Sequence, residues 1–205
     1  KIAALEGAER CVALASGMAA VHASIAAFVS AGDHVIAPRG LYAETARVLR
    51  GHFARFGVET TFVDTTDLAS IESALRPSTR VVYVETPANP TLAVTDIEGA
   101  ARIARAAGAV LIVDSTFATP YHQRPLEHGS DLVLHSATKA LGPRVPSVSR
   151  SERSRNVPLS AKVTRPSNAS RSCMKRRTSS EACGSTVPRE PLRSSVIGAR
   201  SMPRL

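Results

Sequence analysis

The chain has no tryptophan, three cysteines and only 4% aromatic residues among its 205 residues. No run approaches the ~18 consecutive apolar residues that a membrane span needs, so we expect no membrane partner. The cysteines, at positions 11, 173 and 183, follow neither a metal-ligand nor a disulfide spacing, which predicts a reducing, cytoplasmic location. The six histidines lack paired metal-ligand spacing, so no metal site is expected.

Two phosphate-binding motifs are also missing. Neither G-x-G-x-x-G nor G-x-x-x-x-G-K-[ST] occurs, which disfavours both a dinucleotide-binding domain and a P-loop NTPase. The hydrophobic share of 43% is nevertheless sufficient to bury a core. Disorder throughout the chain is therefore excluded.

Charge divides the chain near residue 142. Residues 1–142 carry 12 basic and 14 acidic side chains, whereas residues 143–205 carry 14 basic and three acidic ones. All eight aromatic residues lie in the first part, and the second holds 14 serines, 12 arginines and seven prolines. The net charge of +9 therefore comes from the second part alone.

The second part, residues 143–205, shows no period of 2 or 3.6 residues. We expect an Arg/Ser/Pro-rich tail that is disordered, because it cannot bury enough apolar area to offset its ordering entropy. A shifted reading frame in GC-rich coding sequence would also produce such text, and we favour that origin. A basic arm for nucleic acid is disfavoured, because the tail has no aromatic residues for base stacking and no known module.

Residues 1–142 alternate helical and strand-like segments. Apolar strands are expected at 34–37, 58–63, 81–84, 110–113 and 132–134, and helices at 16–29, 42–56, 68–75 and 96–107. Strands that are apolar throughout and alternate with helices predict an α/β fold, a mostly parallel sheet with helices on both faces.

Three of these strands end in polar side chains. Glu85 with Asn89 follows one strand, Asp114 with Thr116 the next, and a Ser-Ala-Thr-Lys segment, 136–139, a third. Ligands of open parallel sheets bind outside the carboxyl ends of the strands, so we expect one shared site. The competing explanation for any single strand is that its end is polar only because it contacts water.

The residue types at these ends match one cofactor. Ser16 and Gly17 open a helix whose N–H groups suit a phosphate. Asp114 follows a buried strand and suits a protonated pyridine nitrogen, while Lys139 in a dry site would have a depressed pKa and act as an amine nucleophile toward an aldehyde. Pyridoxal phosphate requires these three functions together. A plain serine cap and a surface lysine are the competing interpretations.

An ordered set of motifs then resembles a known family. The matching segments are Leu-Glu-Gly-Ala-Glu at 5–9, Ser-Gly-Met at 16–18, Gly-Asp at 32–33, Glu-Thr-Pro-Ala-Asn-Pro at 85–90, Val-Asp-Ser-Thr-Phe-Ala-Thr-Pro at 113–120, Arg-Pro-Leu at 124–126, Gly-Ser-Asp at 129–131 and His-Ser-Ala-Thr-Lys at 135–139. They resemble the Cys/Met-metabolism, trans-sulfuration family of pyridoxal-phosphate enzymes. The resemblance implies the large domain of fold type I, in incomplete form, over residues 1–142.

The resemblance implies catalytic roles for two residues. Lys139 would be the Schiff-base lysine and the base that takes the α-proton. Tyr42 would stack on the cofactor ring and assist protonation of the leaving group; a tyrosine merely packed at a helix start is the alternative. The implied activity is a C–S lyase or γ-replacement reaction on a sulfur amino acid or homoserine ester.

The resemblance also implies a set of cofactor contacts. Asp114 would pair with the pyridinium nitrogen, Asn89 would contact the ring hydroxyl, and Thr116 would support Asp114 or the ring. The phosphate would bind at the backbone of Gly17 and Met18, beside Ser16, and at the hydroxyls of Ser136 and Thr138. Relatives of this family are homo-oligomers, commonly tetramers.

The similarity stops after Lys139. The segment that follows, 140–144, departs from the family's aromatic residue and small turn, and the C-terminal domain and the N-terminal arm of the family are not recognisable. We therefore expect a truncated or frame-shifted copy. The alternative function is a catalytically dead fragment without turnover.

Overall fold

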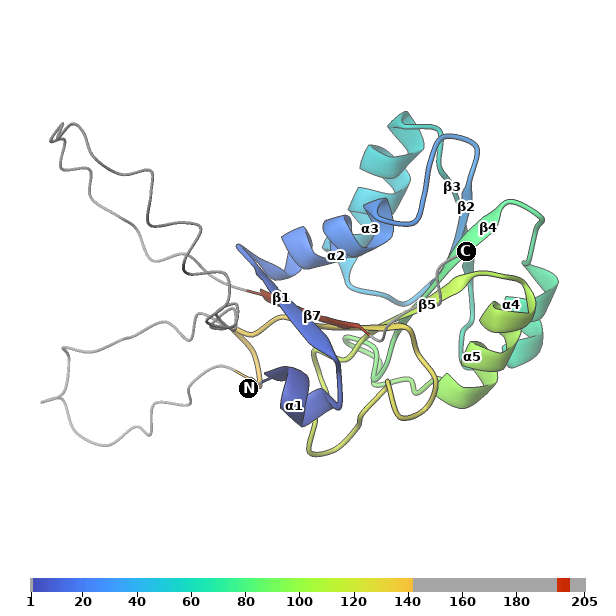
Figure 1. The fold of residues 1–205 in the computed structure, drawn as a ribbon. Coiled ribbons are helices and arrows are strands. Elements are labelled where there is room, and N and C mark those ends of the chain that lie inside the picture. Colours follow the sequence, from blue (N-terminus) through green and yellow to red (C-terminus); the bar gives the residue numbers. More distant parts are fainter. Residues whose placement is uncertain (1, 142–194, 200–205) are drawn as a thin grey trace, which may run out of the picture.

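The computed structural model describes residues 2–141 and the backbone of residues 195–199 (Figure 1). These residues form one seven-stranded sheet of order β1-β7-β6-β5-β4-β2-β3. Its strands are β1 (Arg10–Leu14), β2 (His34–Pro38), β3 (Glu59–Val63), β4 (Thr79–Glu85), β5 (Val110–Asp114), β6 (Leu132–His135) and β7 (Ser195–Ala199). The helices are α1 (Ile2–Glu6), α2 (Gly17–Ala26), α3 (Ala43–Arg47), the π-helix η1 (Val48–Phe53), α4 (Leu68–Ser73) and α5 (Ile97–Ala106).

The prediction of a mostly parallel α/β sheet is confirmed. Strands β3, β2, β4, β5 and β6 pair in parallel, and β7 runs antiparallel to both β6 and β1. Strands β2 and β6 are buried along their whole length, and β4 at every position but one. Such strands are covered on both faces, which explains why their sequences are apolar throughout instead of alternating.

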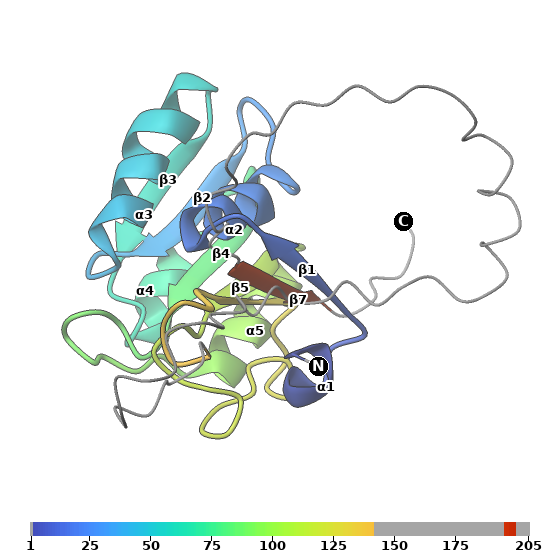
Figure 2. The same ribbon diagram turned by 90° about the vertical axis from the view of Figure 1, so that its left-hand side faces the viewer.

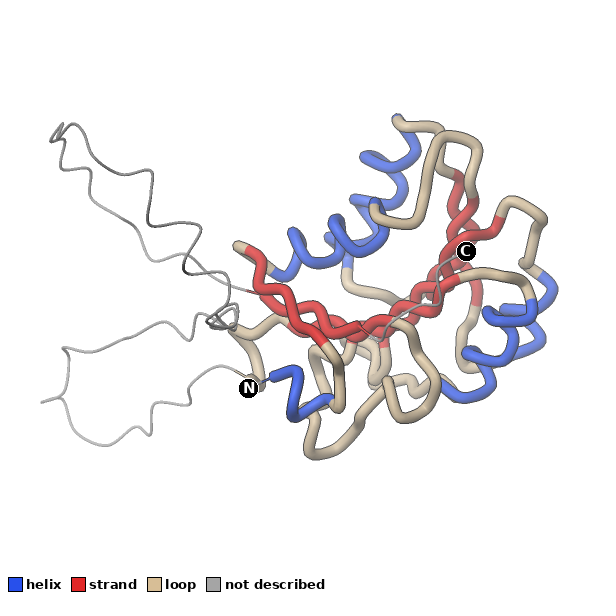
Figure 3. The backbone as a smooth tube through the Cα atoms, viewed as in Figure 1, coloured by secondary structure: helices blue, strands red, loops and turns tan. Residues whose placement is uncertain are grey.

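Helices lie on both sides of the sheet, as Figures 1 and 2 show. Helices α2 and α3 with η1 cover one face, while α1, α4 and α5 cover the other. Figure 3 shows the strands as one twisted layer between them. The helix boundaries follow from the sequence: Asp96 caps α5 by accepting from the Gly99 N–H at 3.0 Å, and Gly108 beyond its end has a φ of 67°, which glycine adopts readily.

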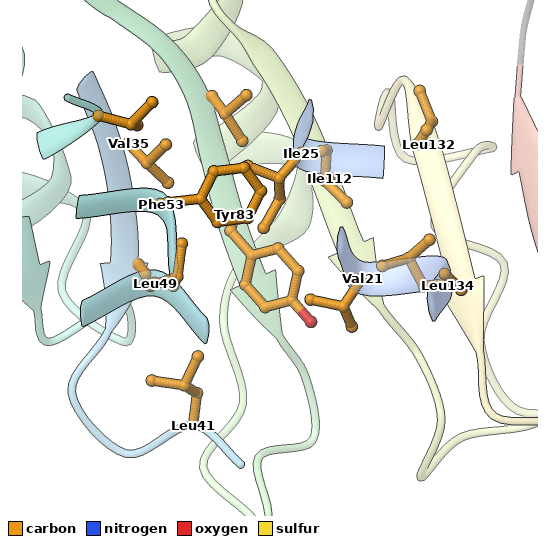
Figure 4. Packing of buried hydrophobic residues seen from close by; sticks show 14 residues of the cluster. Val21, Ile25, Val35, Leu41, Leu49, Phe53, Tyr83, Ile112, Leu132 and Leu134 are labelled. Atoms are coloured by element: carbon orange, nitrogen blue, oxygen red, sulfur yellow. The ribbon is translucent and has the colours of Figure 1, made fainter. Parts of the chain in front are cut away.

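The core beneath α2 and η1 positions the site. Val21 and Ile25 of α2 pack with Leu49 and Phe53 of η1 around the buried ring of Tyr83 on β4 (Figure 4). All five side chains are at most 3% exposed. Burying one such side chain stabilises the fold by about 1.5–3 kcal/mol, so this cluster holds α2 firmly on the sheet.

The expectation of a tail without regular structure over residues 143–205 falls almost entirely outside the described residues. The five that are described, Ser195–Ala199, form β7, which sequence patterning does not anticipate. Strand β7 lies between β6 and β1, so β1 joins the sheet through it. Because β1 leads directly into α2, this late segment helps to place the start of α2.

A proline at position 197 tests this arrangement. Ile197 pairs with Val12 on one side and with Leu134 on the other, so Ile197→Pro removes an N–H from an interior strand. We expect the free energy of unfolding, measured by chemical denaturation, to fall by at least about 1 kcal/mol. Ile197→Val is the control. Equal stability of the two variants would contradict the placement of β7 inside the sheet.

Candidate active site

Parallel pairing brings the polar strand ends to one edge of the sheet. Glu85, the last residue of β4, lies opposite Asp114, the last residue of β5, and Asp114 lies opposite Leu134 near the end of β6. The polar residues after β6 therefore continue from the same edge. This is the position at which open parallel sheets bind ligands.

A cavity of ≈ 220 Å³ opens at this edge. All ten site residues expected from the sequence line it: Ser16, Gly17, Met18, Tyr42, Asn89, Asp114, Thr116, Ser136, Thr138 and Lys139. The structure thus brings together residues from five separate stretches of the chain. Their individual roles stay predictions.

Asp114 is held by two hydrogen bonds. The Tyr83 phenol donates to Oδ2 at 3.0 Å, and the Thr116 N–H donates to Oδ1 at 3.0 Å. Burial, together with the nearby carboxylates of Asp114 and Glu85, raises the pKa of Tyr83 well above its ordinary value, so the phenol keeps its proton and stays a donor. The carboxylate is therefore oriented before any ligand arrives.

Glu85 is a second buried carboxylate, 5% exposed. Its Oε2 accepts from the Tyr42 N–H and its Oε1 from the Asn89 N–H, each at 2.8 Å. Burial raises the pKa of Glu85, an effect that these two backbone hydrogen bonds oppose. One side chain thus fixes the backbone of two residues that are expected to contact the cofactor ring.

The start of α2 forms one wall of the cavity. The Ser16 Oγ accepts from the Ala19 N–H at 3.1 Å, and helix geometry leaves the N–H groups of Gly17 and Met18 without an intrahelical acceptor. A Cβ at position 17 would lie 3.2 Å from both Cβ and Oγ of Ser136. Glycine therefore allows the helix start and the serine hydroxyl to approach closely, as a shared anion site requires.

Lys139 lies at the end of a tight turn. Its N–H donates to the Ser136 carbonyl at 3.0 Å, and the Ser136 N–H donates to Thr116 Oγ1 at 2.9 Å. Lys139 is exposed in the structure, and the dry site considered for it stays a prediction. The turn places it at the rim of the cavity, where water reaches it.

Tyr42 precedes the first residue of α3 and is 45% exposed. Its side chain makes no capping hydrogen bond to the helix. The side chain is thus partly covered, and the alternative of a tyrosine packed at a helix start stays open. An exposed ring at the cavity wall is available to stack on a planar ligand.

Sequence reasoning missed several lining or supporting residues. Thr45, Phe117, Leu134 and His135 also line the cavity. Tyr83 gave no signal beyond a strand-like pattern, although its position two residues before Glu85 puts both side chains on one face of the sheet.

The sequence predicts neither a metal site nor a membrane partner. Within residues 2–141 and 195–199, no three or more His, Cys, Asp or Glu side chains cluster as metal ligands would. Over the same residues, no helix combines the length and apolar character needed to cross a membrane.

Comparison with known proteins identifies the family. The family model described as "Cys/Met metabolism PLP-dependent enzyme" matches residues 1–145. The chain belongs to this family. Members of the Cys/Met metabolism family depend on pyridoxal phosphate, in agreement with the cofactor and the resemblance predicted from the sequence.

Individual relatives of this family are close in sequence. An L-methionine gamma-lyase of Fusobacterium nucleatum is 49% identical over 142 residues, which cover 69% of this chain and 36% of the relative. A cystathionine gamma-lyase of Bacillus subtilis is 51% identical over 138 residues, covering 67% of this chain and 36% of the relative. The chain therefore spans about a third of the length of these relatives.

A solved structure shows the same fold. The cystathionine gamma-lyase from Lactobacillus plantarum, crystallised with L-serine, matches with a TM-score of 0.72 and 32% identity. The match covers 98% of this chain and 40% of the solved one. The arrangement of strands around the cavity is thus shared with a member of the Cys/Met metabolism family.

The double acceptor role of Glu85 yields a prediction. Glu85→Gln keeps the shape but replaces one acceptor oxygen with an NH₂ group, which would face the N–H of Tyr42 or Asn89. We expect the affinity for pyridoxal phosphate to fall about tenfold, as for one lost hydrogen bond. Because a neutral amide avoids the cost of a buried charge, the melting temperature should change little.

Fluorescence titration with the cofactor, alongside thermal unfolding of the cofactor-free chain, measures both quantities. Glu98→Gln, at the start of α5, is the matched control and should leave both unchanged. A Glu85→Gln chain with unaltered cofactor affinity would show that the two N–H contacts do not shape the site.

Proposed function

We propose that this chain is the cofactor-binding part of a pyridoxal-phosphate-dependent enzyme that acts on sulfur amino acids or homoserine esters, by C–S cleavage or γ-replacement. The observation that carries the proposal is the meeting of Asp114, Lys139 and the start of α2 at one cavity. These are the three groups that the cofactor's pyridine nitrogen, aldehyde and phosphate require. The names of the close relatives support the reaction class.

The residues at the start of α2 fit the phosphate group of the cofactor. The first N–H groups of α2 carry the positive end of the helix dipole, and the hydroxyls of Ser136 and Thr138 lie 3.2 Å apart on the facing turn. The close approach at Gly17 excludes a side chain from this corner. A dianion there would be bound by backbone and hydroxyl donors.

The chain's own residues would divide the chemistry among them. When bound, pyridoxal phosphate supplies an electron sink for the substrate's α-carbon. Asp114 would pair with the ring nitrogen and favour its protonated form, and Tyr83 and Thr116 maintain the orientation of the carboxylate. The Lys139 amine would hold the coenzyme and would serve as the base for the α-proton, and the Tyr42 phenol would be the proton donor to the leaving group.

A second candidate is a form that binds the cofactor without turnover. One observation favours it: Lys139 is exposed among the described residues, so the structure does not show the water-excluded lysine that the chemistry requires. Cofactor binding and turnover therefore need separate measurements.

Lys139→Ala tests the role of the lysine. The wild-type chain with pyridoxal phosphate should show the visible absorption band of the coenzyme bound to an amine, and borohydride should fix it irreversibly to a peptide containing Lys139. The variant should lose the band and the fixed adduct while it keeps its melting temperature, because the residue is exposed. Lys1→Ala is the control.

Two readouts separate the candidates: release of a keto acid from L-methionine or L-cystathionine, and release of succinate from O-succinyl-L-homoserine in the presence of a thiol. Turnover that disappears in Lys139→Ala supports the enzyme, whereas an absorption band without turnover supports the inactive form. Failure of the wild-type chain to bind pyridoxal phosphate at saturating concentration would contradict both.

A further inference from the structure

A buried acid–imidazole pair lies behind the cavity. His135 Nε2 and Glu6 Oε1 are 2.5 Å apart, and the two residues are 2% and 1% exposed. They are separated by 129 positions in the sequence, since Glu6 ends α1 and His135 ends β6. Neither residue has a role in the chemistry described above.

The His135 side chain points to the face of the sheet opposite α2, although His135 as a residue also lines the cavity. Successive side chains of a strand point to opposite faces. Leu134 packs in the cluster beneath α2 (Figure 4), and Ser136 lies next to Gly17 at the start of α2. His135 between them therefore points to the other face, which α1 covers (Figures 1 and 2).

The pair is poorly explained as a device for stability. Glu6 Oε2 is buried and has no hydrogen-bond partner among the described residues, so His135 is the main support of a buried carboxyl group. A buried ion pair is often no more stabilising than an apolar pair of similar volume, because both groups must leave water. It does, however, fix geometry, because either group without the other would be buried unpaired.

The geometry that it fixes leads directly into the site. The residue after His135 is Ser136, whose N–H donates to Thr116 Oγ1 at 2.9 Å and whose carbonyl accepts from the Lys139 N–H at 3.0 Å. The N–H of Thr116 in turn donates to Asp114 at 3.0 Å. A shift of His135 would thus be passed to both Asp114 and Lys139.

We propose that Glu6 is a positioning residue for the cofactor site: from the far face of the sheet, its carboxyl group holds the His135 imidazole and thereby fixes the turn that carries Lys139. The inference rests on the proposed function, because it concerns the same cavity. It assigns to α1, which does not line the cavity, a part in holding the coenzyme.

Three variants test the proposal. Glu6→Ala removes the acceptor, Glu6→Gln keeps one oxygen in its place, and Ile71→Ala truncates a fully buried side chain of α4 away from the cavity, as a control for lost stability. We measure the melting temperature of the cofactor-free chain, the affinity for pyridoxal phosphate, and the rate at which borohydride fixes the coenzyme to Lys139.

Glu6→Ala should lower the affinity at least about tenfold and slow the fixation, whereas Glu6→Gln should stay within about threefold of wild type. Ile71→Ala should lower the melting temperature with both binding quantities unchanged. If Glu6→Ala does not fold, Glu6→Asp replaces it, because its carboxylate is one methylene too short to reach His135.

Three results would overturn the positioning role. In the first two, Glu6→Ala leaves the cofactor affinity and the fixation rate at wild-type values, or changes them no more than Ile71→Ala does. In the third, Glu6→Gln shows the same loss of affinity and fixation rate as Glu6→Ala. A wild-type chain that binds no pyridoxal phosphate would overturn the proposed function together with this inference. If the wild-type chain binds pyridoxal phosphate and the Glu6 variants bind it equally well, only the inference about Glu6 is overturned.

Discussion

Parallel pairing of β4, β5 and β6 is the constraint on which the site depends. Parallel strands end at the same edge of a sheet, and here the register sets Glu85 beside Asp114 and Asp114 beside Leu134. Residues that are far apart in the sequence are therefore neighbours at this edge, and hydrogen bonds such as that from the Ser136 N–H to Thr116 Oγ1 add to the strand pairing. The crossover helices that parallel pairing requires also bring the start of α2 and the residue before α3 to this edge.

The cavity is organised chiefly by two carboxylates that accept hydrogen bonds from other groups of the protein. Asp114 and Glu85 each accept two hydrogen bonds from protein groups, which offsets the cost of removing a charge from water. In return, these bonds fix Thr116, Tyr42 and Asn89. A site with oriented acceptors needs little rearrangement when a ligand binds, and this lowers the entropic cost of binding.

Different residues of the site were predictable to different degrees. Asp114 and Lys139 follow apolar strands, and a chemically demanding side chain in that position is conspicuous in the sequence. Tyr83 and Glu6 are not, because their importance comes from a partner 31 or 129 positions away. The exposure of Lys139 could not be predicted either, since only the packed chain decides how much water reaches the residue.

The sequence alone determined the class of fold, because apolar strand runs and helix caps are local patterns. The polar strand ends, together with the resemblance to a known family, pointed to the cofactor and to the ten lining residues. The tertiary structure alone decided the place of β7, the double acceptance by Glu85 and the pairing of Glu6 with His135. These depend on contacts between distant segments, and a contact of this kind leaves no periodic trace in either segment. Sequence patterns thus indicate which residues lie at the strand ends, and tertiary packing decides which contacts hold them there.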